Sequence, residues 1–148
     1  MLFVVLLSCL LLGCATIKPT PYQEREHIYN VSFDTAWTKS IEMLTQENFP
    51  IKSMDKSNGI ILTDYNKNQI NDSWISKGQY TLSIFISSID NGNIKVIINP
   101  SYEIYFPGGI SATSYGPKID NGEWVADNSK DKILIDKYFK ILDGKLNK

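Results

Sequence analysis

The sequence predicts an α+β fold, a two-layer sandwich in which an antiparallel sheet of about five strands carries two helices on one face. Two observations predict it: an apolar stripe with helical spacing lies near each end of the folded region, and two hairpin patterns lie between these stripes. Consecutive hairpins pair antiparallel, and the flanking helices then cover one face of the sheet. The expected order is β-α-β-β-β-β-α. The 148 residues, 43% of them hydrophobic, suffice for one domain with its own core.

The N-terminal segment indicates export and lipid attachment. Residues 1–13 are uncharged and almost entirely apolar, too short a run for a helix that crosses a bilayer but typical of a signal peptide. Leu11-Leu12-Gly13-Cys14 resembles the lipobox of bacterial lipoproteins, in which the cysteine is acylated and becomes the new N-terminus. The resemblance implies lipidation of Cys14 and, because Ala15 follows it, an outer membrane location facing the periplasm. An ordinary secretory signal or a short uncleaved anchor is the alternative.

Lipidation would leave the mature chain without a thiol. Cys9 lies in the segment to be removed and Cys14 would become a thioether, so no disulfide is expected. Acyl chains at about 0.8 kcal/mol per buried methylene give a stable anchor. Residues 14–27 are expected to form the lipidated cysteine and a polar tether, whose extended reach is about 45 Å. Residues 28–148 then form the single folded domain.

The first predicted elements are a short strand over His27–Val31 and a helix over Phe33–Glu47. The apolar stripe of the helix consists of Phe33, Trp37, Ile41 and Leu44. Ser32 is suited to cap its start, and Asn48 can adopt the left-handed conformation at its end. An aromatic residue on such a stripe usually packs in the core, so Trp37 is expected to be buried.

Two hairpins are predicted next. Strands over Ile51–Asp55 and Ile60–Tyr65 flank an Asn58-Gly59 turn, and clear alternation over residues 80–87 precedes a turn at 90–93. The return strand begins at Ile94. Because proline cannot donate a ladder hydrogen bond, this strand should end at Pro100 or lie there at an edge or bulge.

A second helix is predicted at the C-terminus, with Asn128 or Ser129 as its cap and Gly144 at its end. Its apolar face consists of Leu134, Tyr138, Ile141 and Leu142, broadened by Ile133, Ile135 and Phe139.

Residues 33–63 also resemble a known family. The matching pieces are Phe33-Asp34-Thr35-Ala36-Trp37, Leu44, Phe49-Pro50-Ile51 and Asp55-Lys56-Ser57-Asn58-Gly59-Ile60-Ile61-Leu62-Thr63. Together they resemble the repeated unit of BamC-like lipoproteins, with its early helical tryptophan, its aromatic-x-isoleucine and its Asp-x-x-x-Gly-x-Ile turn. The resemblance implies a single BamC-like domain and an accessory role in outer-membrane assembly.

The sequence offers few candidates for chemistry. A net charge of −1 disfavours nucleic acid as a partner. His27, the only histidine, is expected to face solvent, because a serine–histidine–acid triad would require it to be drawn into a pocket. A glycosidase would need two facing carboxylates such as Glu103 and Glu123, but solubilising surface charge is the simpler interpretation.

Two further motifs point to turns rather than to ligands. Asp120-Asn121-Gly122-Glu123 lacks the ligand pattern of a calcium loop, and Gly108-Gly109 lacks the lysine and hydroxyl residue of a phosphate loop. We therefore expect no cofactor, no metal and no enzymatic activity.

A long irregular segment is predicted over Phe106–Asp127, and a shorter one with Trp74 over Asn66–Gly78. Long loops in compact domains tend to be functional, and aromatic residues favour interfaces. The candidate partner-binding residues are Tyr105, Phe106, Tyr115 and Trp124. In the alternative interpretation these side chains fold back and cover the sheet.

The leading hypothesis is a lipid-anchored, non-catalytic protein-interaction module that contacts another envelope protein. The alternative is a lipoprotein that holds a lipid or a small apolar ligand between its sheet and helices. An envelope hydrolase comes third, because it would require a pocket that joins His27 or two carboxylates.

Overall fold

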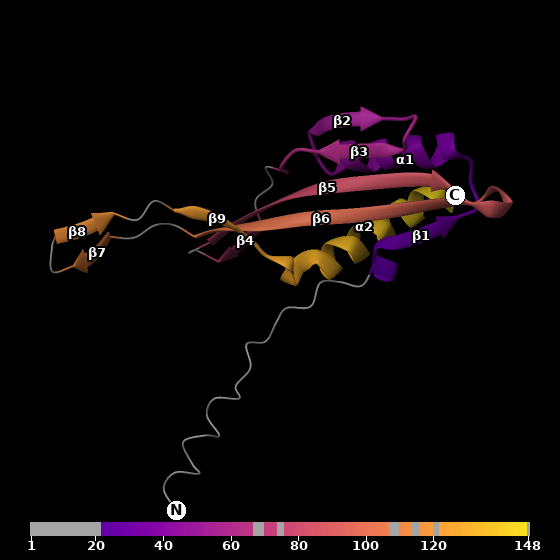
Figure 1. Cartoon of the computed structure of the whole chain (residues 1–148). Helices are drawn as coiled ribbons and strands as arrows, with labels where there is room; N and C mark the ends of the chain where they lie inside the picture. The colour runs from indigo at the N-terminus through magenta and orange to yellow at the C-terminus, as the bar shows by residue number, and fades with distance from the viewer. Residues whose placement is uncertain are drawn as a thin grey trace, which may run out of the picture.

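The computed structural model describes residues 22–66, 70–73, 76–106, 110–113, 116–119 and 122–147 (Figure 1). It confirms the α+β two-layer sandwich: helices α1 and α2 lie on one face of an antiparallel sheet with strand order β1-β6-β5-β3-β2. These are the five expected strands. Two short strands extend the sheet, β4 beside β5 and β9 beside β6, while β7 and β8 form a separate two-stranded sheet.

The strands are β1 (Glu26–Tyr29), β2 (Ile51–Asp55), β3 (Ile60–Thr63), β4 (Ile70–Ser73), β5 (Ser76–Ser88), β6 (Ile94–Phe106), β7 (Ile110–Thr113), β8 (Gly116–Ile119) and β9 (Glu123–Ala126). The α-helices are α1 (Phe33–Gln46) and α2 (Asp131–Leu146). Short 3-10 turns cover Tyr22–Arg25, Asp90–Gly92 and Asn128–Lys130.

Helix α1 has the predicted caps. The Ser32 hydroxyl accepts a hydrogen bond from the Thr35 amide at 3.1 Å. At the other end Asn48 adopts a φ of 59°, and the amide of Phe49 reaches back to the carbonyl of Leu44 at 2.9 Å. This is the Schellman arrangement, and it ends the helix at Gln46, one residue earlier than expected.

The β2–β3 turn brings the backbone very close to β5. The Asp55 carboxylate accepts hydrogen bonds from the Ser57 hydroxyl and the Asn58 amide group, and Gly59 has a φ of 67°. The Gly59 carbonyl accepts from the Ile86 amide at 2.8 Å, and a Cβ at Gly59 would lie 1.9 Å from the Ile86 carbonyl oxygen. The position therefore requires glycine.

Strand β6 runs straight through Pro100 and does not end there. Pro100 lies opposite Leu82, whose amide donates to the Thr63 hydroxyl on the other side of β5. Because backbone polar groups alternate in direction along a strand, the Pro100 nitrogen faces away from β5. On that side β1 pairs with β6 only as far as Ile97, and the pairing of β6 with β9 starts at Glu103, so Pro100 occupies a local edge.

Helix α2 differs from the prediction at both ends. Asp127, rather than Asn128 or Ser129, is the cap: it accepts from the Ser129 amide at 2.8 Å and starts a 3-10 turn, and the α-helix begins only at Asp131. Gly144 does not end the helix: its φ lies outside the left-handed region, and the helix continues to Leu146.

The buried face of α2 consists of Leu134, Ile135, Tyr138, Phe139, Leu142 and Leu146, whereas Ile133 is 63% exposed. Described side chains fill the space between the layers: the hydroxyls of Tyr80 and Tyr138 lie 2.7 Å apart, and Phe49 packs edge-on against both rings. Trp37 is 7% exposed, which confirms its expected place in the core.

The two segments expected to be irregular contain strands. Within residues 106–127, β9 pairs with β6, and β7 pairs with β8 at the end of the molecule farthest from the helices (Figure 1). Within residues 66–78, β4 pairs with β5. These strands depend on neighbouring backbone for pairing and lack apolar alternation, so the sequence alone does not predict them. In the part of the chain with described coordinates, no helix is long and apolar enough to cross a membrane.

Candidate functional site

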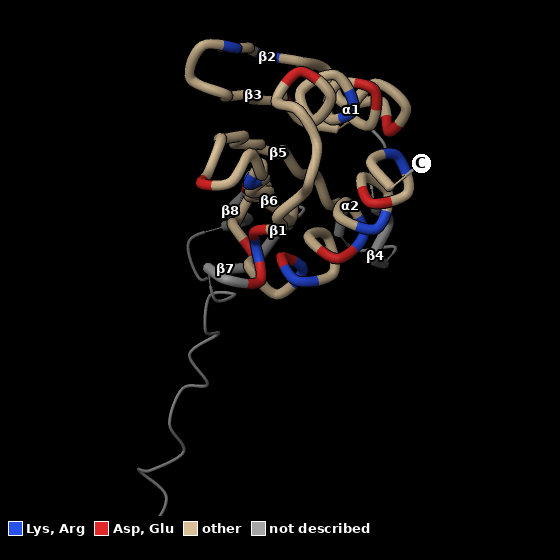
Figure 2. The backbone as a smooth tube through the Cα atoms, turned by 90° about the vertical axis from the view of Figure 1, so that its right-hand side faces the viewer, with Lys and Arg blue, Asp and Glu red and all other residues tan. Residues whose placement is uncertain are grey.

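The sheet face opposite the helices, which we call the open face, is where the candidate residues gather. Tyr80, Leu82 and Ile84 of β5 are buried under the helices, so the alternating residues between them point to the open face. Figure 2 shows Lys, Arg, Asp and Glu mainly along α1 and α2 and around β1. The open-face positions of β5 from residue 81 to residue 87 are uncharged.

An apolar row crosses the middle of the open face. Ile60 of β3, Phe85 of β5 and Ile97 of β6 lie opposite one another in register. The next row, Leu62, Ser83 and Asn99, is mostly polar. Such side chains hold the strands together through cross-strand contacts and leave a largely neutral surface.

Two of the predicted aromatic residues meet at one end of the open face. Tyr105 of β6 lies opposite Trp124 of β9, with ring centroids 5.2 Å apart and an interplanar angle of 47°. Trp124 is 41% exposed. Figure 1 shows that this end, where β4 and β9 join the sheet, extends past both helices.

Glu103, two residues before Tyr105 on the same face, links β6 to Gln79 of β5 and to Tyr65. One carboxylate oxygen accepts from the Gln79 side-chain amide at 3.0 Å, and the other accepts from the Tyr65 hydroxyl at 3.1 Å. Partial burial, together with the carboxylate of Glu103, raises the pKa of Tyr65, so its hydroxyl remains a donor. We call Tyr65, Glu103, Tyr105 and Trp124 the aromatic end.

The structure thus brings together Tyr105 and Trp124 among the four predicted residues. Phe106 is the last residue of β6, opposite Glu123, and its side chain lies outside the described residues, as do Tyr115 and Trp74. The partnership of Tyr65 with Glu103 was not predicted, because it joins residues 38 positions apart without a local signal.

The two carboxylates considered for a glycosidase do not face each other. Glu103 belongs to the open face, whereas Glu123 directly precedes Trp124, which lies opposite Tyr105 on that face, so Glu123 belongs to the other face. Both carboxylate oxygens of Glu103 are already hydrogen bonded. The sheet therefore separates Glu103 from Glu123, and the two carboxylates cannot flank a sugar between them.

His27 lies on the surface between β1 and α2. Its ring stacks on Phe139 with centroids 3.8 Å apart, and its Nδ1 lies 3.5 Å from a carboxylate oxygen of Asp143. That oxygen accepts from the Tyr29 hydroxyl at 2.6 Å. Burial, and secondarily Asp143, raises the pKa of Tyr29, which holds the proton on the tyrosine. These contacts pack β1 against α2, and no serine or cysteine takes part in the described contacts of His27.

Three successive charged residues within the segment expected to be tether hold the chain where β1 begins, at Glu26. Glu24 lies 3.4 Å from Lys132 and Glu26 lies 3.8 Å from Lys95. Between them, Arg25 forms a 2.9 Å ion pair with Asp131 and also approaches Asn99 at 3.4 Å. Local sequence gave no sign of these partners, because they lie far along the chain.

The Asp131 carboxyl is only 3% exposed, and one of its oxygens has no hydrogen-bond partner among the described residues. Burial raises the pKa of Asp131 although the Arg25 guanidinium acts in the opposite direction. The ion pair thus holds the segment around Arg25 beside the unpaired edge of β6 at Pro100.

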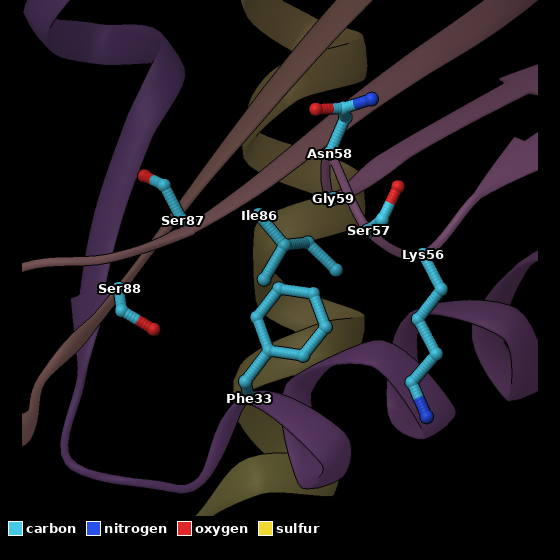
Figure 3. Close-up of a pocket in the computed structure, with 8 residues that line it drawn as sticks. All are labelled: Phe33, Lys56, Ser57, Asn58, Gly59, Ile86, Ser87 and Ser88. Atoms are coloured by element: carbon cyan, nitrogen blue, oxygen red, sulfur yellow. The ribbon is translucent and has the colours of Figure 1, made fainter.

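Two described pockets lie outside the interior between sheet and helices. The larger, about 450 Å³, lies where the β2–β3 turn meets the start of α1 and the end of β5 (Figure 3). The other, about 410 Å³, lies along one side of α1 beside Trp37 and Ile41. The expected alternative of an apolar ligand between the layers therefore gains no support, because described side chains occupy that space.

Among residues with described coordinates, no group of three or more His, Cys, Asp or Glu side chains could hold a metal ion. No family model matches this sequence, and no curated protein matches it.

Proposed function

We propose that this chain is a lipid-anchored lipoprotein of the bacterial cell envelope and that its folded domain is a non-catalytic protein-interaction module. The domain faces the periplasm from the outer membrane and contacts another envelope protein through the aromatic end. The exposed Tyr105–Trp124 pair is the observation that carries this proposal.

The chemistry of the aromatic end suits a protein interface. Tyrosine and tryptophan supply a large contact area with little rotamer entropy to lose, and both retain a polar group for hydrogen bonding. Glu103 holds the neighbouring Tyr65 in place, so this part of the surface is organised before a partner arrives. Trp124 could still bury much of its area in a complex.

The proposed anchor fits the way the folded domain begins. Lipidated Cys14 would be joined through the tether to the clamp formed by Glu24, Arg25 and Glu26. The ten residue steps from Cys14 to Glu24 reach about 35 Å when extended. The domain would then stay near the membrane while its sheet remained accessible to a periplasmic partner.

The accessory role in outer-membrane assembly rests on the BamC-like resemblance. In the structure the resembling residues have packing roles: Trp37 lies in the core, and Gly59 permits the close approach to Ile86. Such roles support a shared fold, while the role in assembly depends on which partner the aromatic end contacts.

Site-specific photocrosslinking in intact cells tests the proposed contact. A benzophenone amino acid at position 124 should yield a discrete adduct with one envelope protein, and the additional change Tyr105→Ala should reduce its yield. Position 133 on α2 is the matched control, since Ile133 is also apolar and exposed. No adduct at 124, or the same adducts from both positions, would argue against the aromatic end as the interface.

A further inference from the structure

The pocket at the β2–β3 turn is a second surface with a defined chemistry. It is lined by Phe33, Lys56, Ser57, Asn58, Gly59, Ile86, Ser87 and Ser88, which three separate elements contribute (Figure 3). Its volume of about 450 Å³ falls within the range of small-molecule sites. The aromatic end lies beside the start of β5, whereas the pocket lies at the end of this strand, so the two surfaces are distinct.

The apolar part of the pocket is a rigid aromatic platform. Figure 3 shows the Phe33 ring and the Ile86 side chain facing each other at its centre. Phe33 also stacks with Trp37, with centroids 6.0 Å apart and an interplanar angle of 18°. A Cβ at Gly59 would lie 3.4 Å from an edge carbon of the Phe33 ring, an ordinary contact distance, so the ring lies directly beside the β2–β3 turn.

Polar side chains also line the pocket, and in Figure 3 those of Ser57 and Asn58 point away from Phe33. The Ser57 hydroxyl and the Asn58 amide nitrogen donate to Asp55, which leaves the serine lone pairs and the asparagine carbonyl oxygen able to accept. In Figure 3 the Ser88 hydroxyl points to the same side as Phe33. The pocket thus combines one ring face with both hydrogen-bond donors and acceptors.

The charge of the pocket is balanced. The only charged lining residue, Lys56, places its ammonium group 3.0 Å from a carboxylate oxygen of Asp34. This pairing reduces the attraction for a free anion and leaves lysine N–H groups for neutral acceptors. The combination favours a ligand with an apolar face, several hydroxyl groups and no net charge.

We propose that this pocket binds a pyranose ring of an uncharged saccharide, with the apolar face of the sugar stacked on Phe33 and its hydroxyls bonded to Lys56 and Ser88. The site itself does not depend on the proposed function. Only the natural source of the sugar depends on the proposed location in the envelope. There, an N-acetylated amino sugar would come from a cell-wall glycan and a plain glucose polymer from another polysaccharide.

Sugar titrations followed by ¹H–¹⁵N NMR test this site. The full chain is kept in a detergent without a sugar headgroup and titrated separately with tri-N-acetylchitotriose, maltotriose and inorganic phosphate. At least one sugar should shift the amides of Gly59 and Ser88 and the indole signal of Trp37, with a Kd of about 1 mM. The sugar that binds identifies the source.

Variants then assign the contacts. Phe33→Leu keeps an apolar side chain but removes the ring, and Ser88→Ala removes one hydroxyl; each should weaken binding by a factor of about 10. Ser101→Ala is the matched control, since Ser101 is an exposed strand serine of the open face, and its Kd should not change. Preserved dispersion of the spectra shows that each variant is folded.

Three results would overturn the proposal: no shift of these signals at about 20 mM sugar, shifts with phosphate alone, or sugar affinity that Phe33→Leu leaves unchanged. Because the titration uses purified protein, its failure would leave the crosslinking result at position 124 intact. A negative crosslinking result would equally leave the sugar site intact.

Discussion

An added side chain at Gly59 should strongly lower the stability of the fold. The backbone φ of 67° and the nearby carbonyl of Ile86 both exclude a Cβ. Gly59→Ala should lower the free energy of unfolding by about 3 kcal/mol, from backbone strain plus overlap, as measured by chemical denaturation.

Gly92→Ala is the control for this prediction. Gly92 has a similar φ of 76° but has no atom within 4 Å of the added Cβ, so only the backbone cost of about 1 kcal/mol should appear. Equal losses in the two variants would show that the close approach to Ile86 contributes nothing.

The pKa of Asp55 should lie below the usual aspartate value, and the pKa of Asp131 should lie above it. Hydrogen bonds from Ser57 and Asn58 lower the pKa of Asp55 from 3.8 to about 2, so its contribution to stability is present above 3.8 and is lost as the pH falls towards 2. Burial raises the pKa of Asp131, so its contribution grows as the pH falls through that raised value.

Carboxyl ¹³C chemical shifts followed against pH measure both groups. Asp55 should remain ionised after most other carboxylates have been protonated, while Asp131 should protonate before them. Ser57→Ala should move the pKa of Asp55 upwards, because its largest stabilising contact is removed. A normal titration of Asp55 would contradict the described turn.

Local sequence signals predicted the helices and strands whose caps and turns lie within the same stretch of sequence. Helix α1 followed from an apolar stripe between Ser32 and Asn48, and the first hairpin followed from Asn58-Gly59. At Pro100 the edge alternative is confirmed, because the strand continues past a proline whose nitrogen faces a gap between two partner strands.

The end of α2 provides a prediction at the scale of a single element. Gly144 lies inside the helix with open space around its Cα, so it costs helix stability without serving as a terminator. Gly144→Ala should raise the free energy of unfolding by about 0.5–1 kcal/mol, measured by chemical denaturation. A loss of stability would indicate that the helix ends near residue 144 after all.

At the scale of the whole molecule, the sequence predicted the layers better than the surfaces. The aromatic content around residues 105–124 indicated a contact region, and the structure brings Tyr105 and Trp124 together within it. The link from Tyr65 to Glu103, the clamp at Arg25 and the pocket beside Phe33 each depend on residues distant in sequence. Tertiary contacts of this kind leave no local pattern.

The proposed role of the module depends on its being held at a membrane by a lipid on Cys14. Intact mass spectrometry of the protein extracted from cell envelopes measures this lipid directly. We expect a chain that begins at Cys14 and carries the added mass of acyl chains, and Cys14→Ser should abolish that mass and release the protein from the membrane fraction. A chain without lipid mass, or a Cys14→Ser variant that stays equally membrane-bound, would contradict the proposed anchor.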